Sequence, residues 1–412
     1  MSAGSILRDR AVVALLVAEV VSTSGMQMTW LALPWFVLLA TGSATRMTLV
    51  LAAELIGLAA FGLPAGKALG RLGARRTMVL CDGLRGPLML VIPILHWTSG
   101  TSFPVLLAVA FALGALGAPY FAAQKVIVPE LLGEDERRVT RANAFFQGAT
   151  RATLLLGPVI GGALIGVIGA PSVLVVDAAT YVVAVVLVAG FVPARPRLPT
   201  AEATRVQDGL RFLSRERLLR VWWPTFALGD AAWTAFFASI PVIVVTRFGE
   251  DPAIAGWLIA SFGIGAVIGN LASYRVIVPR FDGYAIIAAC VMGQALPLWL
   301  LSFDLPPAGL SAAIVASGIA NGIVNPSLHS IMTLRIPAAL RPTAMTAAMT
   351  GWALVNPLGV FAAGPVLDAA GPEPVLVAFA AVQTVTMAVV ALTAARERSR
   401  PVPAPLARAA GG

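Results

Sequence analysis

The sequence predicts an all-α polytopic membrane protein in which twelve transmembrane helices form two pseudo-symmetric six-helix bundles. Three observations lead to this prediction. Of 412 residues, 58% are hydrophobic and 12% are charged, whereas about 25% of residues are charged in a soluble domain. Apolar stretches of about 20 residues recur along the chain, each long enough to cross a hydrocarbon layer of about 30 Å. Arginines and prolines at corresponding places of the helices also recur at an offset of about 200 residues, as expected of two related halves.

The apolar stretches define the helices in order. The first is too long for the apolar core of a cleaved signal peptide, so it is kept as a span. The twelve predicted spans are centred in residues 11–40, 47–65, 77–97, 103–124, 144–168, 172–194, 221–246, 253–274, 283–303, 307–332, 343–366 and 373–394.

Basic residues give the orientation. Of the 29 Lys and Arg residues, 25 lie in the N-terminus, in the loops that follow even-numbered spans, or in the C-terminal tail. Short cytoplasmic loops of membrane proteins carry such an excess. We therefore expect both termini on the cytoplasmic side of a bacterial inner membrane. The net charge of +9 then marks the lipid surface and gives no indication of nucleic-acid binding.

The segment between the sixth and seventh spans divides the chain near its midpoint. Within it, Val206, Leu210 and Leu213 recur at helical spacing among arginines, which predicts an amphipathic helix on the inner leaflet. The predicted parts are an N-terminal bundle (1–194), a cytoplasmic linker (195–220), a C-terminal bundle (221–396) and a disordered cytoplasmic tail (397–412).

Corresponding helices of the two halves carry arginine and proline at similar positions. The stretch RANAFFQGATRATLLLGP runs from Arg141 to Pro158 in helix five, and RPTAMTAAMTGWALVNP runs from Arg341 to Pro357 in helix eleven. Each helix therefore starts at an arginine and carries a proline in mid-membrane at nearly the same distance. Such a repeat is typical of transporters whose solute site lies between the halves.

The stretch GPVIGGALIGVIG, residues 157–169, is rich in glycine and contains no charge. Small residues let transmembrane helices approach closely. Gly157 and Gly161 lie one turn apart, as do Gly162 and Gly166, so we expect the two pairs to form one packing groove. Pro158 favours a bend. Tight packing and a bending helix at the joint between the halves are both open interpretations.

Two motifs resemble the Major Facilitator Superfamily, specifically its drug:proton antiporter branch and the exporters related to the enterobactin exporter. GPVIGG at Gly157–Gly162 is similar to the fifth-helix antiporter motif, and GKALGRLGARR at Gly66–Arg76 is similar to the family's loop between helices two and three. The loop motif has its usual residues at Arg71, Gly73, Arg75 and Arg76, but Gly70 stands where the family normally has Asp.

The resemblance implies proton-coupled export of a small amphiphilic molecule by alternating access, and a monomer. It also implies gating by the motif residues Gly66, Arg71, Gly73, Arg75, Arg76, Gly157, Pro158, Gly161 and Gly162. Asp82 is a candidate substitute for the missing carboxylate, because it is expected near Arg75 and Arg76. Asp82 and Arg85 lie three residues apart on one helix face and are expected to pair as a gating or packing ion pair.

A charged side chain inside a membrane span is energetically unfavourable, so its presence indicates function. Glu19 and Asp230 occur at similar depth in corresponding helices, so we expect them to face one central cavity as proton or cation-substrate sites; hydrogen bonding between helices is the alternative. Burial in low dielectric raises a carboxylate's pKa, which allows proton exchange near neutral pH. Glu54 is a third candidate. Arg151 is expected either to bind an anionic substrate or to neutralise a carboxylate, whereas Asp177 is expected near the outer surface and hydrated.

Polar and aromatic residues at middle depth are suited to a cavity for a drug-like molecule. The candidate lining residues are Gln27, Trp30, Gln147, Trp233, Asn321, Asn325, Trp352 and Asn356. Interfacial anchoring and helix packing are the alternative roles for these residues.

The sequence contains no phosphate-binding glycine-rich loop and no His/Cys metal cluster, so neither a cofactor, nor a metal, nor catalysis is predicted. The expected partners are a small-molecule substrate, protons and the lipid bilayer. Proton-coupled uptake by the same fold is the alternative function, followed by a non-transporting receptor and an embedded enzyme.

Overall fold

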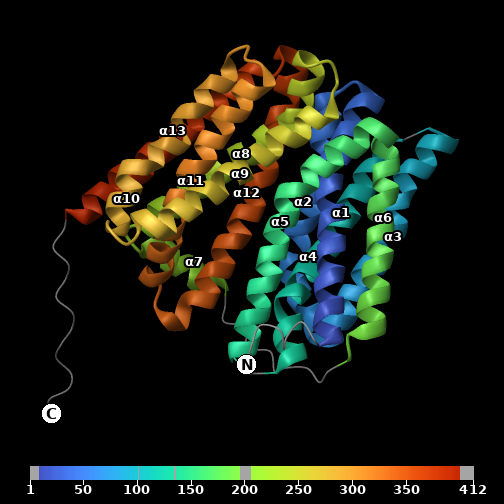
Figure 1. The fold of residues 1–412 in the computed structure, drawn as a ribbon, viewed down its shortest axis with the longest axis horizontal. Coiled ribbons are helices and arrows are strands. Elements are labelled where there is room, and N and C mark those ends of the chain that lie inside the picture. The colour runs from blue at the N-terminus through green and yellow to red at the C-terminus, as the bar shows by residue number, and fades with distance from the viewer. Residues whose placement is uncertain (1–8, 101, 134–135, 195–205, 400–412) are drawn as a thin grey trace.

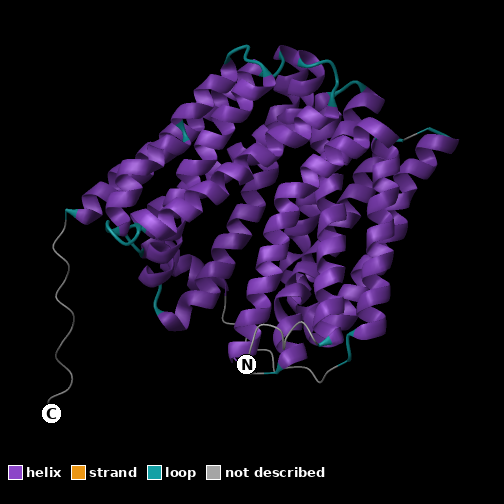
Figure 2. Cartoon of the chain, in the orientation of Figure 1, coloured by secondary structure: helices purple, strands orange, loops and turns teal. Residues whose placement is uncertain are grey.

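The protein is described by a computed structural model that covers residues 9–100, 102–133, 136–194 and 206–399. These residues form helices joined by short loops (Figures 1 and 2). Twelve of the helical segments are long and apolar enough to cross a membrane, and each predicted span is found. The ends agree within four residues, except that the fourth span continues to Leu132 and the fifth begins at Arg138. The predicted fold class is therefore confirmed. The predicted tail, apart from its first residues, lies outside the described residues.

The two groups of six spans form two bundles that lie beside each other (Figure 1). The first bundle consists of α1 (Arg10–Thr41), α2 (Ala44–Leu72), α3 (Ala74–Thr98), α4 (Phe103–Leu132), α5 (Glu136–Ile168) and α6 (Ala170–Phe191). The second consists of α8 (Leu219–Arg247), α9 (Pro252–Ala272) with η2 (Ser273–Ile277), α10 (Gly283–Cys290) with η3 (Val291–Gln294) and η4 (Leu296–Ser302), α11 (Pro307–Arg335), α12 (Arg341–Ala370) and α13 (Glu373–Arg398).

Corresponding glycines show that the bundles repeat one packing scheme. A Cβ on Gly57 of α2 would overlap the carbonyl oxygen of Phe111, and one on Gly114 of α4 would overlap that of Glu54. In the second bundle Gly265 of α9 and Gly318 of α11 face each other's helix backbones in the same way. Small residues permit this close approach in lipid, so the equivalent helix pairs of both halves pack through glycine.

The hydrophobic core is shared at one end of the molecule and divided at the other. One buried cluster includes residues from both bundles, among them Leu33, Trp35, Phe236 and Phe379. At the end that carries the basic loops, which we call the basic end, each bundle has its own cluster. In Figure 1 the bundles converge at the end away from the label N. The halves are therefore joined opposite the basic end and separate toward it.

The glycines of α5 contact two different helices. A Cβ on Gly157 would overlap Gln27 of α1, and one on Gly161 would lie 3.1 Å from the Cα of Met28. Gly162 instead faces the carbonyl oxygen of Pro252 at the start of α9, and Gly256 of α9 faces that of Pro158. The expected single groove is thus two faces. One packs α5 within its own bundle, and the other packs it against the second bundle.

The linker helix α7 (Val206–Arg215) occurs where the amphipathic pattern predicts a helix. Leu213 is buried, whereas Leu210 is 40% exposed. A Cβ on Gly209 would lie 2.6 Å from the carbonyl carbon of Thr343 in α12. The helix is therefore packed against α12 of the second bundle. The sequence analysis had placed it on the surface of the inner leaflet.

Replacing Gly162 by alanine tests the contact between α5 and α9. The added methyl group would overlap the carbonyl oxygen of Pro252, and forced overpacking costs about 1–3 kcal/mol. We expect a lower melting temperature of the purified protein in detergent. Gly166→Ala is the matched control, because its Cβ would meet the Pro252 side chain at an ordinary 3.6 Å. Equal melting temperatures for the two variants would contradict this packing.

Candidate functional site

A cavity of about 470 Å³ lies between the two bundles. We call it the central cavity. Its wall is largely apolar and comes from α1, α2 and α5 of the first bundle and α8, α9, α11 and α12 of the second. Its polar lining residues are Gln27, Glu54, Arg151, Thr234, Asn270, Asn321 and Asn325. Few polar groups in an apolar wall are typical of a site for a small hydrophobic molecule.

Glu54 is the carboxylate of this cavity. Because α2 begins at Ala44, Glu54 lies ten residues, or about 15 Å, along the helix. This is the middle of a hydrocarbon layer of about 30 Å, deeper than in the predicted span 47–65, where Glu54 is seven residues from the start. Arg151, from α5, lines the same cavity. Among the described residues neither side chain forms an ion pair within 4 Å, so a solute in the cavity can contact both groups.

The other lining candidates divide between two cavities. Gln27, Trp30, Asn321 and Asn325 line the central cavity. Trp233 and Trp352 line a neighbouring cavity of about 350 Å³ inside the second bundle, which we call the C-terminal cavity. Gln147 and Asn356 line neither of these, but Asn356 Nδ2 donates a hydrogen bond of 2.8 Å to Asp230.

Asp82 and Arg85 form the expected ion pair inside α3, with 3.6 Å between Nη1 and Oδ1 and at most 4% of either side chain exposed. The guanidinium also lies 4.8 Å from the ring centre of Tyr181 and 5.6 Å from that of Tyr120. Asp82 therefore already has a cation, and within the described part of the chain it forms no ion pair with Arg75. It does not take the place of the missing loop carboxylate in this state.

Glu19 and Asp177 are buried inside the first bundle. Glu19 is 2% exposed and accepts hydrogen bonds from Thr23, at 3.2 Å, and from Gln124. Asp177 is fully buried and accepts a hydrogen bond of 2.6 Å from Thr29. The expectation that Asp177 is hydrated is therefore wrong: α6 packs along α1, and this covers the carboxylate.

The structure separates the two carboxylates that were expected to share a cavity. Asp230 lines the C-terminal cavity, whereas Glu19 lines neither cavity and is turned toward Gln124 of α4. The depths are similar, since Glu19 is nine residues from the start of α1 and Asp230 eleven from the start of α8. The difference is the rotation of the two helices about their axes, which equal depth does not determine.

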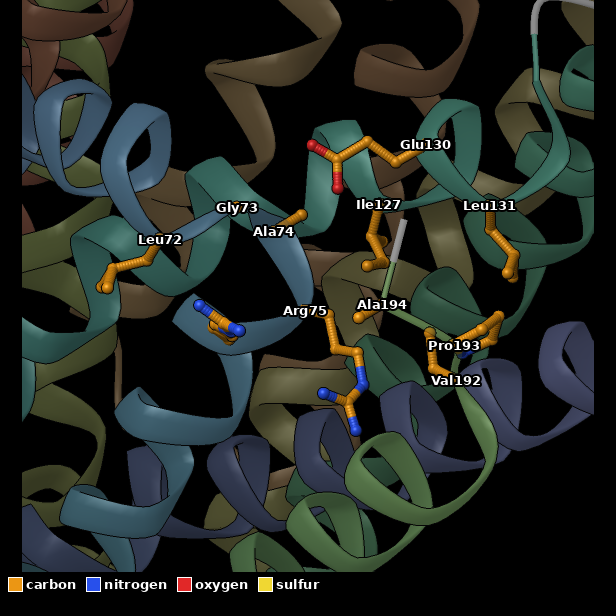
Figure 3. A pocket seen from close by; sticks show the side chains of 11 residues that line it. Leu72, Gly73, Ala74, Arg75, Ile127, Glu130, Leu131, Val192, Pro193 and Ala194 are labelled. Carbon is orange, nitrogen blue, oxygen red and sulfur yellow. The ribbon is translucent and has the colours of Figure 1, made fainter. Parts of the chain in front are cut away.

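The loop motif forms a turn at the basic end of the first bundle (Figure 3). Gly73 has φ of 79°, a conformation that favours glycine, and joins α2 to α3. Arg75 donates a hydrogen bond of 2.5 Å to the carbonyl oxygen of Ala189 in α6. Glu130 of α4 accepts from the backbone N–H of Ala74. These contacts close a pocket of about 320 Å³ within one bundle and supply a carboxylate, Glu130, that the sequence analysis overlooked.

Remaining motif residues lie around this turn. Gly66 of α2 has no atom within 4 Å of a Cβ built on it, so packing does not require glycine there. Arg76 lines the same pocket. Arg71 is in the last turn of α2.

The bundles also meet where α2 begins and α12 ends. Asp368 of α12 accepts hydrogen bonds from the Ser43 hydroxyl at 2.8 Å and from the backbone N–H groups of Ala44 at 2.6 Å and Thr45 at 3.0 Å. An anion at a helix N-terminus satisfies unpaired N–H groups and the helix dipole. Together with the α5–α9 packing we call this the interbundle contact. It lies opposite the basic end.

Several polar residues of the two cavities were not predicted from the sequence. Thr234 and Asn270 line the central cavity, and Gln294 and Gln383 line the C-terminal cavity. Amide and hydroxyl side chains are common helix-packing groups, so no sequence signal distinguishes them. Asp368 could have been found, because it is an acidic residue just beyond the end of a predicted span.

The sequence matches the model of one protein family. The family model described as Major Facilitator Superfamily matches residues 15–360 and 223–409. The chain is 26% identical over 380 residues to "Multidrug efflux pump Tap" of Mycobacterium tuberculosis, covering 89% of each chain. It is 27% identical over 371 residues to the pump of the same name from Mycolicibacterium fortuitum, covering 87% of this chain and 89% of that one.

Solved structures share the fold. The nucleoside transporter NupG superposes with a TM-score of 0.70 at 13% identity, covering 95% of this chain and 100% of that one. The POT family transporter PepTSo gives 0.72 at 12% identity, covering 95% and 99%. These likenesses concern the helix arrangement alone.

Removing Arg85 tests its pairing with Asp82. Breaking a buried ion pair by removing one partner costs about 3–5 kcal/mol, because the other charge is left buried. We expect Arg85→Gln to lower the melting temperature strongly and the double variant Asp82→Asn/Arg85→Gln to recover part of the loss. Arg280→Gln, at an exposed arginine, is the control. A double variant less stable than Arg85→Gln would contradict the pairing.

Neutralising Asp368 tests the interbundle contact. Thr48 of α2 is fully buried beside Gly364 of α12, so a cysteine there reports opening. In a Thr48→Cys variant lacking Cys81 and Cys290, we expect Asp368→Asn to speed maleimide labelling in detergent severalfold, because the amide replaces a charged acceptor. Asp304→Asn, at an exposed loop carboxylate, should leave the rate unchanged. An unaltered rate with Asp368→Asn would contradict the role of Asp368.

Proposed function

The chain belongs to the Major Facilitator Superfamily, and from this premise we propose that it is a secondary transporter that exports small hydrophobic, drug-like molecules from a bacterium in exchange for protons. The observation that carries the proposal is the central cavity, which both bundles line with apolar walls and few polar groups. The relatives named multidrug efflux pumps support export. The family consists of transporters, so the chain is not an enzyme.

The transport cycle follows from where the bundles touch. We place the basic end in the cytoplasm, because basic loops favour that side, with both termini on that side of the inner membrane. The interbundle contact then closes the outer mouth, and the divided cores allow entry from inside. Rocking of the bundles about the central cavity would break that contact and expose the solute outside. The described state is the one that loads a drug.

Proton exchange is assigned to the first bundle. Glu54 lines the central cavity, while Glu19, Asp82 and Asp177 lie in the same bundle behind it. Arg85 is the cation buried among them. Four negative charges beside one positive charge are unfavourable in a low-dielectric interior, so protons are needed to neutralise this group. We propose that Glu54 exchanges its proton with the cavity and that Glu19 and Asp177 are held by their hydrogen bonds.

Arg151 is proposed to guide solutes at the inner part of the cavity. It is exposed and close enough to His329 of the second bundle to interact electrostatically. The Arg151 guanidinium is always charged and lines a cavity with few polar groups. An anionic or strongly polar portion of the solute would pair with it, so Arg151 favours closure around a bound molecule.

Glu54→Gln tests both the site and its coupling. In an efflux-deficient bacterial host loaded with the neutral dye Nile red, we expect the wild type to lower dye retention and Glu54→Gln to slow efflux about tenfold or more, since the amide carries no exchangeable proton. A protonophore should stop efflux by the wild type.

Glu250→Gln is the matched control, because Glu250 is exposed between two spans. It should export dye like the wild type. Efflux by Glu54→Gln at the wild-type rate would contradict the coupling role, and faster dye uptake in cells with the wild type than in cells without it would contradict export.

A further inference from the structure

The C-terminal cavity contains a concentration of unpaired polar atoms. Among the described residues, eight buried side-chain nitrogen and oxygen atoms have no hydrogen-bond partner. Three of them, Trp233 Nε1, Trp352 Nε1 and Gln383 Oε1, belong to residues that line this cavity, and a fourth, Asn356 Oδ1, belongs to the residue that donates a hydrogen bond to Asp230. An unsatisfied buried donor or acceptor costs about 1–3 kcal/mol. Such a concentration in one place indicates a site that a bound molecule completes.

Gln383 is the best-defined of these groups. Its side chain is fully buried, and its Nε2 donates a hydrogen bond of 2.7 Å to the carbonyl oxygen of Gly229. This bond fixes the amide and leaves Oε1 as an acceptor in the residue that lines the cavity. The Nε1 donors of Trp233 and Trp352 belong to lining residues as well.

Asp230 adds a negative charge to this cavity. Its carboxylate accepts from Asn356 Nδ2 at 2.8 Å, and no described Lys, Arg or His lies within 4 Å of it. In the first bundle, by contrast, Asp82 has Arg85. Because a carboxylate at this depth is expensive without a cation, the missing partner in the second bundle is one that a ligand can supply.

Aromatic rings form much of the wall. Trp233 lies 4.4 Å from Phe262 and 5.5 Å from Phe237 between ring centres, and Phe226 and Trp352 also line the cavity. Aromatic faces attract organic cations and stack with flat ligands. Phe237, Phe262, Asn321 and Asn325 line the central cavity too, so a molecule can occupy both spaces.

We propose that the C-terminal cavity is a subsite for lipophilic organic cations, in which Asp230 is the counter-ion, the aromatic rings hold the cationic group and the rest of the molecule extends into the central cavity. This inference rests on the proposed function and narrows its substrate class. It makes Asp230 a substrate-binding residue and leaves proton exchange to the first bundle.

Binding of tetraphenylphosphonium to the purified protein tests the subsite. We expect Asp230→Asn to weaken binding about tenfold or more, since the attraction between the carboxylate and the cation is lost. Trp352→Phe should leave binding nearly unchanged, because the ring is kept and tetraphenylphosphonium has no acceptor for the N–H donor that is removed. Asp304→Asn is the control for loss of one carboxylate. Size-exclusion profiles and melting temperatures establish that each variant is folded. Unchanged affinity in folded Asp230→Asn would overturn the proposal.

Efflux of two dyes separates the subsite from the proposed function. In cells, Asp230→Asn should lose export of the cation ethidium and keep proton-driven export of neutral Nile red. Loss of both dyes would overturn the inference and make Asp230 a general coupling residue. Equal export of ethidium by Asp230→Asn and the wild type would also overturn it. Failure of the wild type to export either dye would instead contradict the proposed function.

Discussion

The rest of the structure depends on the interbundle contact. At that end the backbones of α5 and α9 approach through Gly162 and Gly256, and Asp368 binds the N-terminus of α2. One hydrophobic cluster joins both halves there, while each half has a separate cluster at the basic end. Opening the outer mouth must therefore separate the glycine contacts, the hydrogen bonds of Asp368 and the apolar side chains of the shared cluster.

The two bundles repeat their helices but handle charge differently. The first bundle holds its carboxylates among hydrogen-bond donors and one buried arginine. The second leaves Asp230 with an amide partner and an aromatic cavity. A charge in a membrane interior needs a partner, and the two solutions suit two tasks. In the proposed function the internal cation permits proton exchange without a ligand, whereas in the proposed subsite the ligand supplies the cation that Asp230 lacks.

The fold was predictable because hydropathy sets helix length in a membrane, and all twelve spans follow from it. The site was predictable only in part. Gln27, Trp30, Asn321 and Asn325 line the central cavity as expected, but Glu19 and Asp230 are separated by helix rotation. Glu54 is deeper than expected because α2 begins three residues earlier. Gln383 gives no sequence signal, since only its buried, half-satisfied amide distinguishes it from a packing residue.

Distances between the bundles, measured by electron paramagnetic resonance in lipid nanodiscs, test the central claim that the halves rock about the central cavity. One spin-label pair at Trp97 and Phe303 and another at Arg76 and Leu334, all exposed, report the two ends in a background without Cys81 and Cys290. Addition of a transported dye at acidic pH should lengthen the first distance and shorten the second within the same sample. Two distances that stay fixed, or that lengthen together, would contradict alternating access.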